Sequence, residues 1–366
     1  MKNRKNLWKL LVFPLVLFLF FSPLLLCGEL MSPNLVLAAQ PFLGDKFLYG
    51  MAYTNNIAHY KLRMINRRKA DVIAIGNSRV LQFHDYFFND DTSFYNGGSI
   101  AASLPACLAT LQNIEPDALP EVVILGLDTS FFSESYTLAN HAADTAAFLQ
   151  PYDYKTINLL YDCLASDYKK GKFKLWQIVS QAQRIGVNAK VNGNGYRQDG
   201  SYCYQNVYDD PQTAKLRIAP KLKEIKEGSG RFAGGDEPYA VSLDSLQQII
   251  DFCKEKQIDL IAFTPPFSNA AMDCIRQRTD IDFIPKIAPA VRPMLENAGF
   301  EFYDYTDPAV LSLTDDSFVD AFHGSDCAYL RITIEMLRKG SRLNEYANLA
   351  AIEALYAGRI SDLEIH

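Results

Sequence analysis

Short apolar runs alternate with amphipathic helical patterns along most of the chain. Four runs predict buried strands: DVIAIG from Asp71, EVVILGLD from Glu121, QIDLIAFTPP from Gln257 and the shorter EFYDY from Glu301. The stretch SLDSLQQIIDFCKEK between the second and third of these gathers its apolar residues on one face, which predicts a helix that Ser242 would cap. Strands that alternate with helices predict an α/β fold with a mostly parallel sheet covered on both faces.

Residues 130–240 interrupt this rhythm with aromatic, Asn-rich and Gly-rich pieces. We therefore expect an α/β domain over residues 66–340 with an insertion at about 130–240, which either forms a cap that faces substrate or only packs on one side of the core. Residues 31–65 would form a juxtamembrane segment between this domain and the apolar N-terminal run that is described next. Residues 341–366 would form a C-terminal segment, in which we expect one amphipathic helix from 342 to 360.

The first thirty residues differ from the rest of the chain. Four cations in MKNRKNLWK precede an uncharged apolar run of eighteen residues, which is just long enough to cross a bilayer. The cations predict that the N-terminal side stays in the cytoplasm and that the remainder is extracytoplasmic. The small residues of LVLAAQ, at 35–40, leave a cleaved signal segment and a secreted protein as the alternative to an anchor.

Composition narrows the class of protein. With 49% apolar and 21% charged residues the chain is globular, and its net charge of −6 includes no basic patch suited to nucleic acid. Seven cysteines without a CxxC pair give no metal-like spacing. We therefore expect neither a metal nor a cofactor.

The first apolar run ends in Gly-Asn-Ser followed by arginine. Ser78 would stand at the carboxyl end of a strand, where open α/β sheets collect ligands and catalytic groups. The structural alternative is that Ser78 only caps a following helix.

A serine nucleophile needs a base and a group that orients the base. Of five histidines, only His323 has an acidic residue three positions earlier, Asp320 in SFVDAFHGSD. On a tight loop this spacing brings the carboxylate to Nδ1 of the imidazole and leaves Nε2 for the serine.

These residues resemble the SGNH (GDSL-like) hydrolases, whose fold is a flavodoxin-like three-layer α/β sandwich. The family's first block matches Gly76, Asn77 and Ser78, and its last block, Asp-x-x-His, matches Asp320 and His323. The resemblance implies that Ser78, His323 and Asp320 form a catalytic triad, with Asn77 beside the nucleophile.

The second block of the family supplies a backbone N–H to the oxyanion from a glycine that follows an asparagine. SFYNGGSIAAS fits it loosely through Asn96, Gly97 and Gly98, which implies that Gly98 is the donor. A strict spacing from Asn96 would place Ala101 there instead.

The third block departs from the family, because Asp128 stands where an asparagine side chain usually donates to the oxyanion. An ionised carboxylate only accepts hydrogen bonds. The oxyanion hole must therefore lack this donor, contain a protonated Asp128 or take its donor from another residue. Asp128 could instead hold the Ser78 loop or contact Arg79. Arg79 would then be structural, whereas its alternative role is contact with an anionic substrate.

An N-terminal anchor ahead of such a domain is similar to membrane-tethered members that act in D-alanylation of teichoic acids or O-acetylation of polysaccharides. The resemblance implies a serine esterase or O-acyltransferase acting on acyl esters of an envelope glycan or polymer, beside a membrane-bound O-acyltransferase. The alternative is a degenerate fold that binds or scaffolds an envelope assembly.

Overall fold

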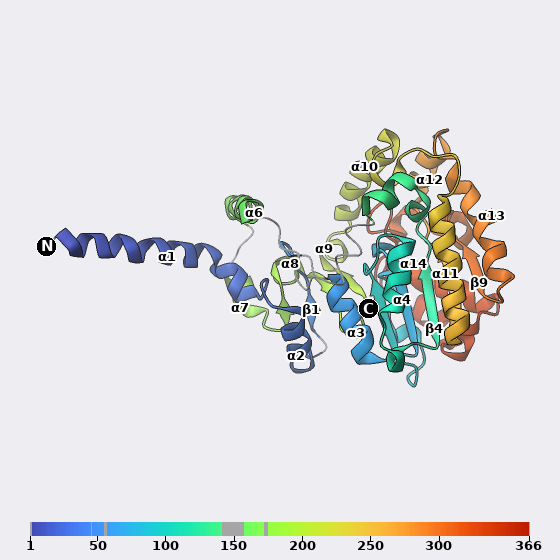
Figure 1. Ribbon diagram of the computed structural model, residues 1–366, viewed down its shortest axis with the longest axis horizontal. Coiled ribbons are helices and arrows are strands. Elements are labelled where there is room, and N and C mark those ends of the chain that lie inside the picture. Colours follow the sequence, from blue (N-terminus) through green and yellow to red (C-terminus); the bar gives the residue numbers. More distant parts are fainter. Residues whose placement is uncertain (1, 45, 55–56, 141–156, 172–174, 366) are drawn as a thin grey trace. The chain divides into compact units, whose positions relative to one another are not determined.

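The structure, a computed structural model, describes residues 2–44, 46–54, 57–140, 157–171 and 175–365. The chain divides into two compact units (Figure 1). Unit 1 comprises residues 1–56, 151–198 and 203–205, and unit 2 comprises residues 57–150, 199–202 and 206–366. We describe each unit by itself.

Unit 1 contains the N-terminal helices and a small sheet. Its helices are α1 (Lys2–Cys27), α2 (Pro33–Leu43), α6 (Ile157–Lys169), α7 (Leu175–Ser180) and α8 (Val187–Asn192). The short strands β1 (Leu48–Tyr49), β5 (Arg184–Ile185), β6 (Asn194–Tyr196) and β7 (Tyr202–Tyr204) form a sheet in the order β5-β1-β6-β7. No helix among the described residues combines the length and the apolar character that crossing a membrane requires.

The stretch predicted as one insertion, 130–240, is shared between the two units. Strands β5 and β6 pair with β1, so residues 151–198 join the N-terminal segment, while residues 206–240 join unit 2. Strand pairing over more than a hundred residues leaves no local pattern, which is why the sequence suggested a single insertion.

Unit 2 is built on a five-stranded parallel sheet. The strands are β2 (Val72–Gly76), β3 (Phe94–Gly98), β4 (Val122–Gly126), β8 (Asp259–Thr264) and β9 (Glu301–Asp304), in the order β3-β2-β4-β8-β9. Numbered along unit 2, this order is 2-1-3-4-5, in which the connections leave β2 and β4 in opposite directions. Such a switch point opens a crevice at the carboxyl ends of β2 and β4, the strands that precede Ser78 and Asp128.

Helices cover both faces of this sheet. Among them, α3 (Ile57–Arg68) packs on β3, α11 (Ala240–Lys256) on β8 and α13 (Phe283–Glu296) on β9. Other helices of this part of the chain are α4 (Leu104–Gln112), α9 (Gln205–Tyr208, whose first residue belongs to unit 1), α10 (Gln212–Glu227), α12 (Asn269–Arg276), α14 (Asp326–Arg338) and α15 (Leu349–Ala357). Alternate strand residues such as Ala74, Ile124 and Phe263 belong to the same buried cluster as α14 and α15. Their neighbours along each strand point to the other face, where α11 packs on β8 and lies beside α4 (Figure 1). This α/β arrangement confirms the predicted parallel sheet and is consistent with a three-layer sandwich.

Two local predictions were wrong. Ser242 lies inside α11, which begins at Ala240, and its hydroxyl donates to the carbonyl of Phe131 instead of capping the helix. The tail is not one helix over 342–360, because a 3-10 turn at Arg342–Glu345 precedes α15 and Asn348 caps α15 by accepting the N–H of Ala351. A short polar side chain that satisfies a backbone donor therefore sets the start of α15, whereas no side chain caps the start of α11.

Candidate active site

The chain leaves β2 through a tight turn that positions Ser78. Ser78–Val80 form a 3-10 turn, and the side-chain oxygen of Asn77 accepts the N–H of Arg79 at 2.9 Å. Asn77, rather than Ser78, is therefore the residue that caps this turn. The Ser78 hydroxyl does not act as a cap and is available for another partner.

Three glycines at the ends of neighbouring strands make room for this turn. Gly76, Gly98 and Gly126 are the last residues of β2, β3 and β4, and the Val80 side chain fills the space beside all three. A Cβ on Gly126 would lie 2.2 Å from Cγ1 of Val80, and one on Gly98 would lie 2.9 Å from Cγ2. The missing side chains therefore let the turn lie directly on the carboxyl edge of the sheet.

Gly126→Ala is accordingly expected to destabilise unit 2 by about 1–3 kcal/mol, because the added methyl group overpacks against Val80. Val80→Ala in the same chain should restore part of the loss. Gly235→Ala is the control, since its added Cβ would meet only Phe283, at 3.5 Å. Urea unfolding followed by circular dichroism measures these changes. Equal stability of the Gly126 and Gly235 variants would contradict the steric argument.

Ser78, His323 and Asp320 form a continuous hydrogen-bonded chain. Oγ of Ser78 lies 2.8 Å from Nε2 of His323, and Nδ1 of His323 lies 2.9 Å and 3.0 Å from the two carboxylate oxygens of Asp320. Ser78 and His323 are 245 residues apart in the chain. The structure thus brings together the three residues that the sequence analysis selected, in the connectivity that a nucleophile, a base and an orienting acid require.

The loop between η7 (Asp315–Ser317) and α14 holds this geometry. The N–H groups of Phe322 and His323 both donate to Oδ1 of Asp320, at 2.8 Å and 2.9 Å. The N–H of Val319 donates to the carbonyl of His323, which closes the loop. Burial opposes ionisation of Asp320, but the His323 imidazole and these N–H donors hold the pKa of its carboxyl below the usual range. Asp320 is therefore an ionised acceptor that fixes the orientation of the imidazole.

The structure does not support the oxyanion donor that we expected at Gly98. The N–H of Gly98 donates to Oδ1 of Asn96 at 2.7 Å, so it is already engaged inside the protein. The amide of Asn96 also donates to the carbonyls of Val80 and Phe83, which fastens the chain that follows Ser78. Asn96 thus stabilises the turn that carries Ser78. Ala101, the residue that the strict spacing selects, places its N–H 3.5 Å from the carbonyl of Gly76, at the base of the same turn.

Arg79 and Asp128 form a buried ion pair. Nη1 of Arg79 lies 3.2 Å from Oδ2 of Asp128, and both side chains are almost completely buried. The rest of the guanidinium donates to the carbonyls of Phe322 and Pro265, and it lies 4.0 Å from the ring centre of Phe267. Arg79 therefore ties the turn that carries Ser78 to the residue that precedes His323, as its structural interpretation requires.

The surroundings of Asp128 keep it ionised. Its burial opposes ionisation, but the charges of Arg79 and Arg231 and the hydroxyl of Ser130 hold its pKa below the usual range. Oδ1 accepts both the N–H and the hydroxyl of Ser130, at 2.8 Å and 2.6 Å. Asp128 is consequently an acceptor with no proton to donate, which removes the option of a protonated Asp128 in the oxyanion hole.

A further cation, Arg231, lies against the His323 loop and was not among the residues that the sequence indicated. The guanidinium of Arg231 lies 5.2 Å from the ring centre of Phe322 and 4.0 Å from Oδ2 of Asp128. Arg231 belongs to GSGRFAGG between α10 and α11, one of the Gly-rich pieces of residues 130–240. An arginine in a glycine-rich segment belongs to no periodic pattern, so the sequence gives no reason to place it near Ser78. Only the fold brings it there.

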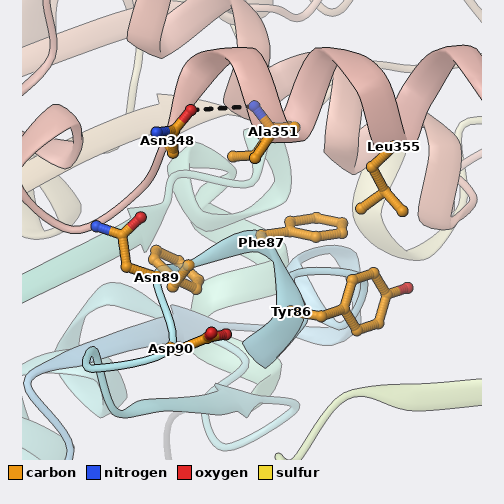
Figure 2. A pocket seen from close by; sticks show the side chains of 9 residues that line it. Tyr86, Phe87, Asn89, Asp90, Asn348, Ala351 and Leu355 are labelled. Atoms are coloured by element: carbon orange, nitrogen blue, oxygen red, sulfur yellow. Dashed lines mark hydrogen bonds between the residues drawn. The ribbon is translucent and has the colours of Figure 1, made fainter.

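A cavity lies in unit 2 away from the triad. Its volume is about 390 Å³. Figure 2 shows Tyr86, Phe87 and Leu355 among its lining side chains, near Asn89 and Asp90. None of the triad residues, nor Arg79, Asp128 or Arg231, lines it. The hydrogen-bonded chain at Ser78 therefore remains the candidate active site.

Comparison with known proteins adds no assignment. No protein-family model matches the chain, and no curated protein sequence is similar enough to count as a relative.

Proposed function

We propose that this protein is a serine ester hydrolase or acyltransferase with an SGNH-like fold. The observation that carries the proposal is the hydrogen-bonded chain from Ser78 through His323 to Asp320 at the carboxyl edge of a parallel sheet. An Nε2 atom 2.8 Å from a serine oxygen suits proton transfer, and an ionised carboxylate on Nδ1 stabilises the imidazolium that follows.

The reaction proceeds in two acyl transfers. Oγ of Ser78 attacks the carbonyl carbon of an acyl ester while its proton passes to Nε2 of His323, and the backbone N–H of Ser78 donates to the developing oxyanion. Collapse of the tetrahedral intermediate breaks the ester bond, and His323 returns the proton to the leaving alcohol. Water or a sugar hydroxyl then attacks the acyl-serine with His323 as base, which releases Ser78 and the acyl product.

The substrate and the location follow from the family resemblance and from the N-terminal pattern. The proposed substrate is an acyl ester of an envelope glycan or polymer, and the proposed partner is a membrane-bound O-acyltransferase. The cations before the apolar run support an extracytoplasmic enzyme held by residues 1–30.

Fluorophosphonate labelling tests the proposal. Attack of Ser78 Oγ on phosphorus expels fluoride and leaves a phosphonyl-serine, which peptide mass spectrometry locates. We expect one label per chain, on Ser78, and no label in Ser78→Ala or His323→Ala. The full chain is used in mild detergent, because α1 exposes large apolar side chains between Val12 and Leu26.

Absence of label in the folded wild-type protein would overturn the proposal. Specific retention on an acylated glycan under that outcome would favour the scaffolding alternative, for which the ionised Asp128 is the motivating observation.

A further inference from the structure

The candidate oxyanion hole has fewer donors than the chemistry requires. The N–H of Gly98 is engaged by Asn96, and Asp128 is an ionised acceptor where a donor is expected. A negative charge at this place would repel an oxyanion unless a cation offsets it. Arg79 neutralises Asp128, but its nitrogens are directed to Asp128 and to the carbonyls of Phe322 and Pro265.

Arg231 is a second cation near Asp128, and one of its N–H donors has no hydrogen-bond acceptor among the described residues. Its Nη1 is buried and donates to no acceptor among the described residues, because Oδ2 of Asp128 lies at 4.0 Å, beyond hydrogen-bond distance. Nε lies 3.8 Å from Oε1 of Glu224, an ion-pair contact that is also too long for a hydrogen bond. The side chain as a whole keeps 18% of its surface exposed, while Nη1 itself is buried. A buried guanidinium nitrogen without an acceptor is costly unless a ligand supplies one.

The loop that carries Arg231 is fixed. Phe232 is buried and packs on the rings of Phe267 and Phe322, at 6.0 Å and 5.3 Å between ring centres. Nη1 of Arg278 donates to the carbonyl of Phe232 at 2.7 Å. This packing holds the Arg231 loop against the residue that precedes His323, which is the preorganisation that electrostatic stabilisation of a transition state needs.

We propose that Nη1 of Arg231 donates a hydrogen bond to the oxyanion that forms when Ser78 attacks an acyl carbonyl. Arg231 then replaces the donor that Asp128 cannot provide, and Asp128 holds the guanidinium in place through its charge. This inference rests on the proposed serine acyl chemistry. The interaction forms as negative charge develops on the carbonyl oxygen, so its loss lowers kcat more than it raises KM.

The experiment compares Arg231→Ala, Arg231→Lys and Lys221→Ala with the wild-type full chain. Lys221 is the matched control, because its Nζ lies 5.2 Å from the same Phe322 ring and pairs with Glu224. The readouts are kcat and KM for a neutral acetyl ester and for a succinyl ester, together with the rate of fluorophosphonate labelling at Ser78. Circular dichroism melting monitors folding.

We expect Arg231→Ala to lower kcat for both esters about 100-fold, as loss of one oxyanion donor does elsewhere. Its KM should change little, and phosphonylation should slow in parallel. Arg231→Lys should recover part of kcat, and Lys221→Ala should remain within about twofold of wild type.

Two results would overturn the assignment. An unchanged kcat in a folded Arg231→Ala would show that the guanidinium does not touch the reacting oxygen. A raised KM confined to the succinyl ester would make Arg231 a substrate-anion contact instead. Failure of wild-type labelling would refute the serine mechanism itself and is distinguishable from both.

Discussion

Ser78→Ala is expected to lower kcat for a small acetyl ester by about 10⁶-fold, and His323→Ala by a similar factor, because the two side chains act as one proton-transfer unit. The double variant should be no slower than either single one, since each alone already disables the unit. Steady-state turnover of the full chain with a chromogenic acetyl ester measures all three.

His59→Ala is the control for loss of an imidazole. His59 lies on α3 and is not part of the triad. Its Nε2 accepts a hydrogen bond from Nε of Arg63. Its turnover should stay near the wild-type value. Additive losses in the double variant would mean that Ser78 and His323 do not function together, despite their 2.8 Å contact.

The second large effect is on stability. Asp128→Ala is expected to destabilise unit 2 by about 3–5 kcal/mol, because it leaves the buried guanidinium of Arg79 without its counter-ion. Both tryptophans, Trp8 and Trp176, lie in unit 1, so their fluorescence does not follow unit 2. Urea unfolding by circular dichroism is the suitable measurement.

Glu227→Ala is the control for an exposed ion pair. Glu227 pairs with Lys223 on the surface of α10, and its loss should cost at most about 1 kcal/mol. Equal effects of the Glu227 and Asp128 variants would show that the Arg79 pair is not a structural element of the site.

The pH dependence of the Asp128 effect has a defined sign. Because the folded-state pKa of Asp128 is depressed, its contribution to stability is complete above the unfolded carboxyl value of about 3.9 and disappears as pH falls toward the folded-state value. The gap between wild type and Asp128→Ala should therefore be full at pH 7 and narrow only in acid below about pH 4.

The apolar runs predicted β2, β4 and β8 because a buried parallel strand needs apolar side chains on both faces. They did not predict β3, whose FYNGG ends in three residues with little strand preference. Those residues pack against the Ser78 turn: the amide of Asn96 donates to the carbonyls of Val80 and Phe83, and Gly98 makes room for Val80. Contacts with this turn therefore outweigh strand preference at the end of β3.

By itself, the sequence determined the alternation of strands and helices, the end of a strand just before Ser78 and the pairing of Asp320 with His323 three positions later. These features depend on neighbours along the chain, and local periodicity and spacing express them directly. The tertiary structure alone decided that Asn77 caps the turn, that Asn96 engages Gly98, and that Arg79 and Arg231 meet at Asp128. The contacts of Asp128 with Arg79 and Arg231 join residues 49 and 103 positions apart. The contacts of Asn77 and Asn96 depend on how a turn and a strand end fold, which no spacing rule specifies.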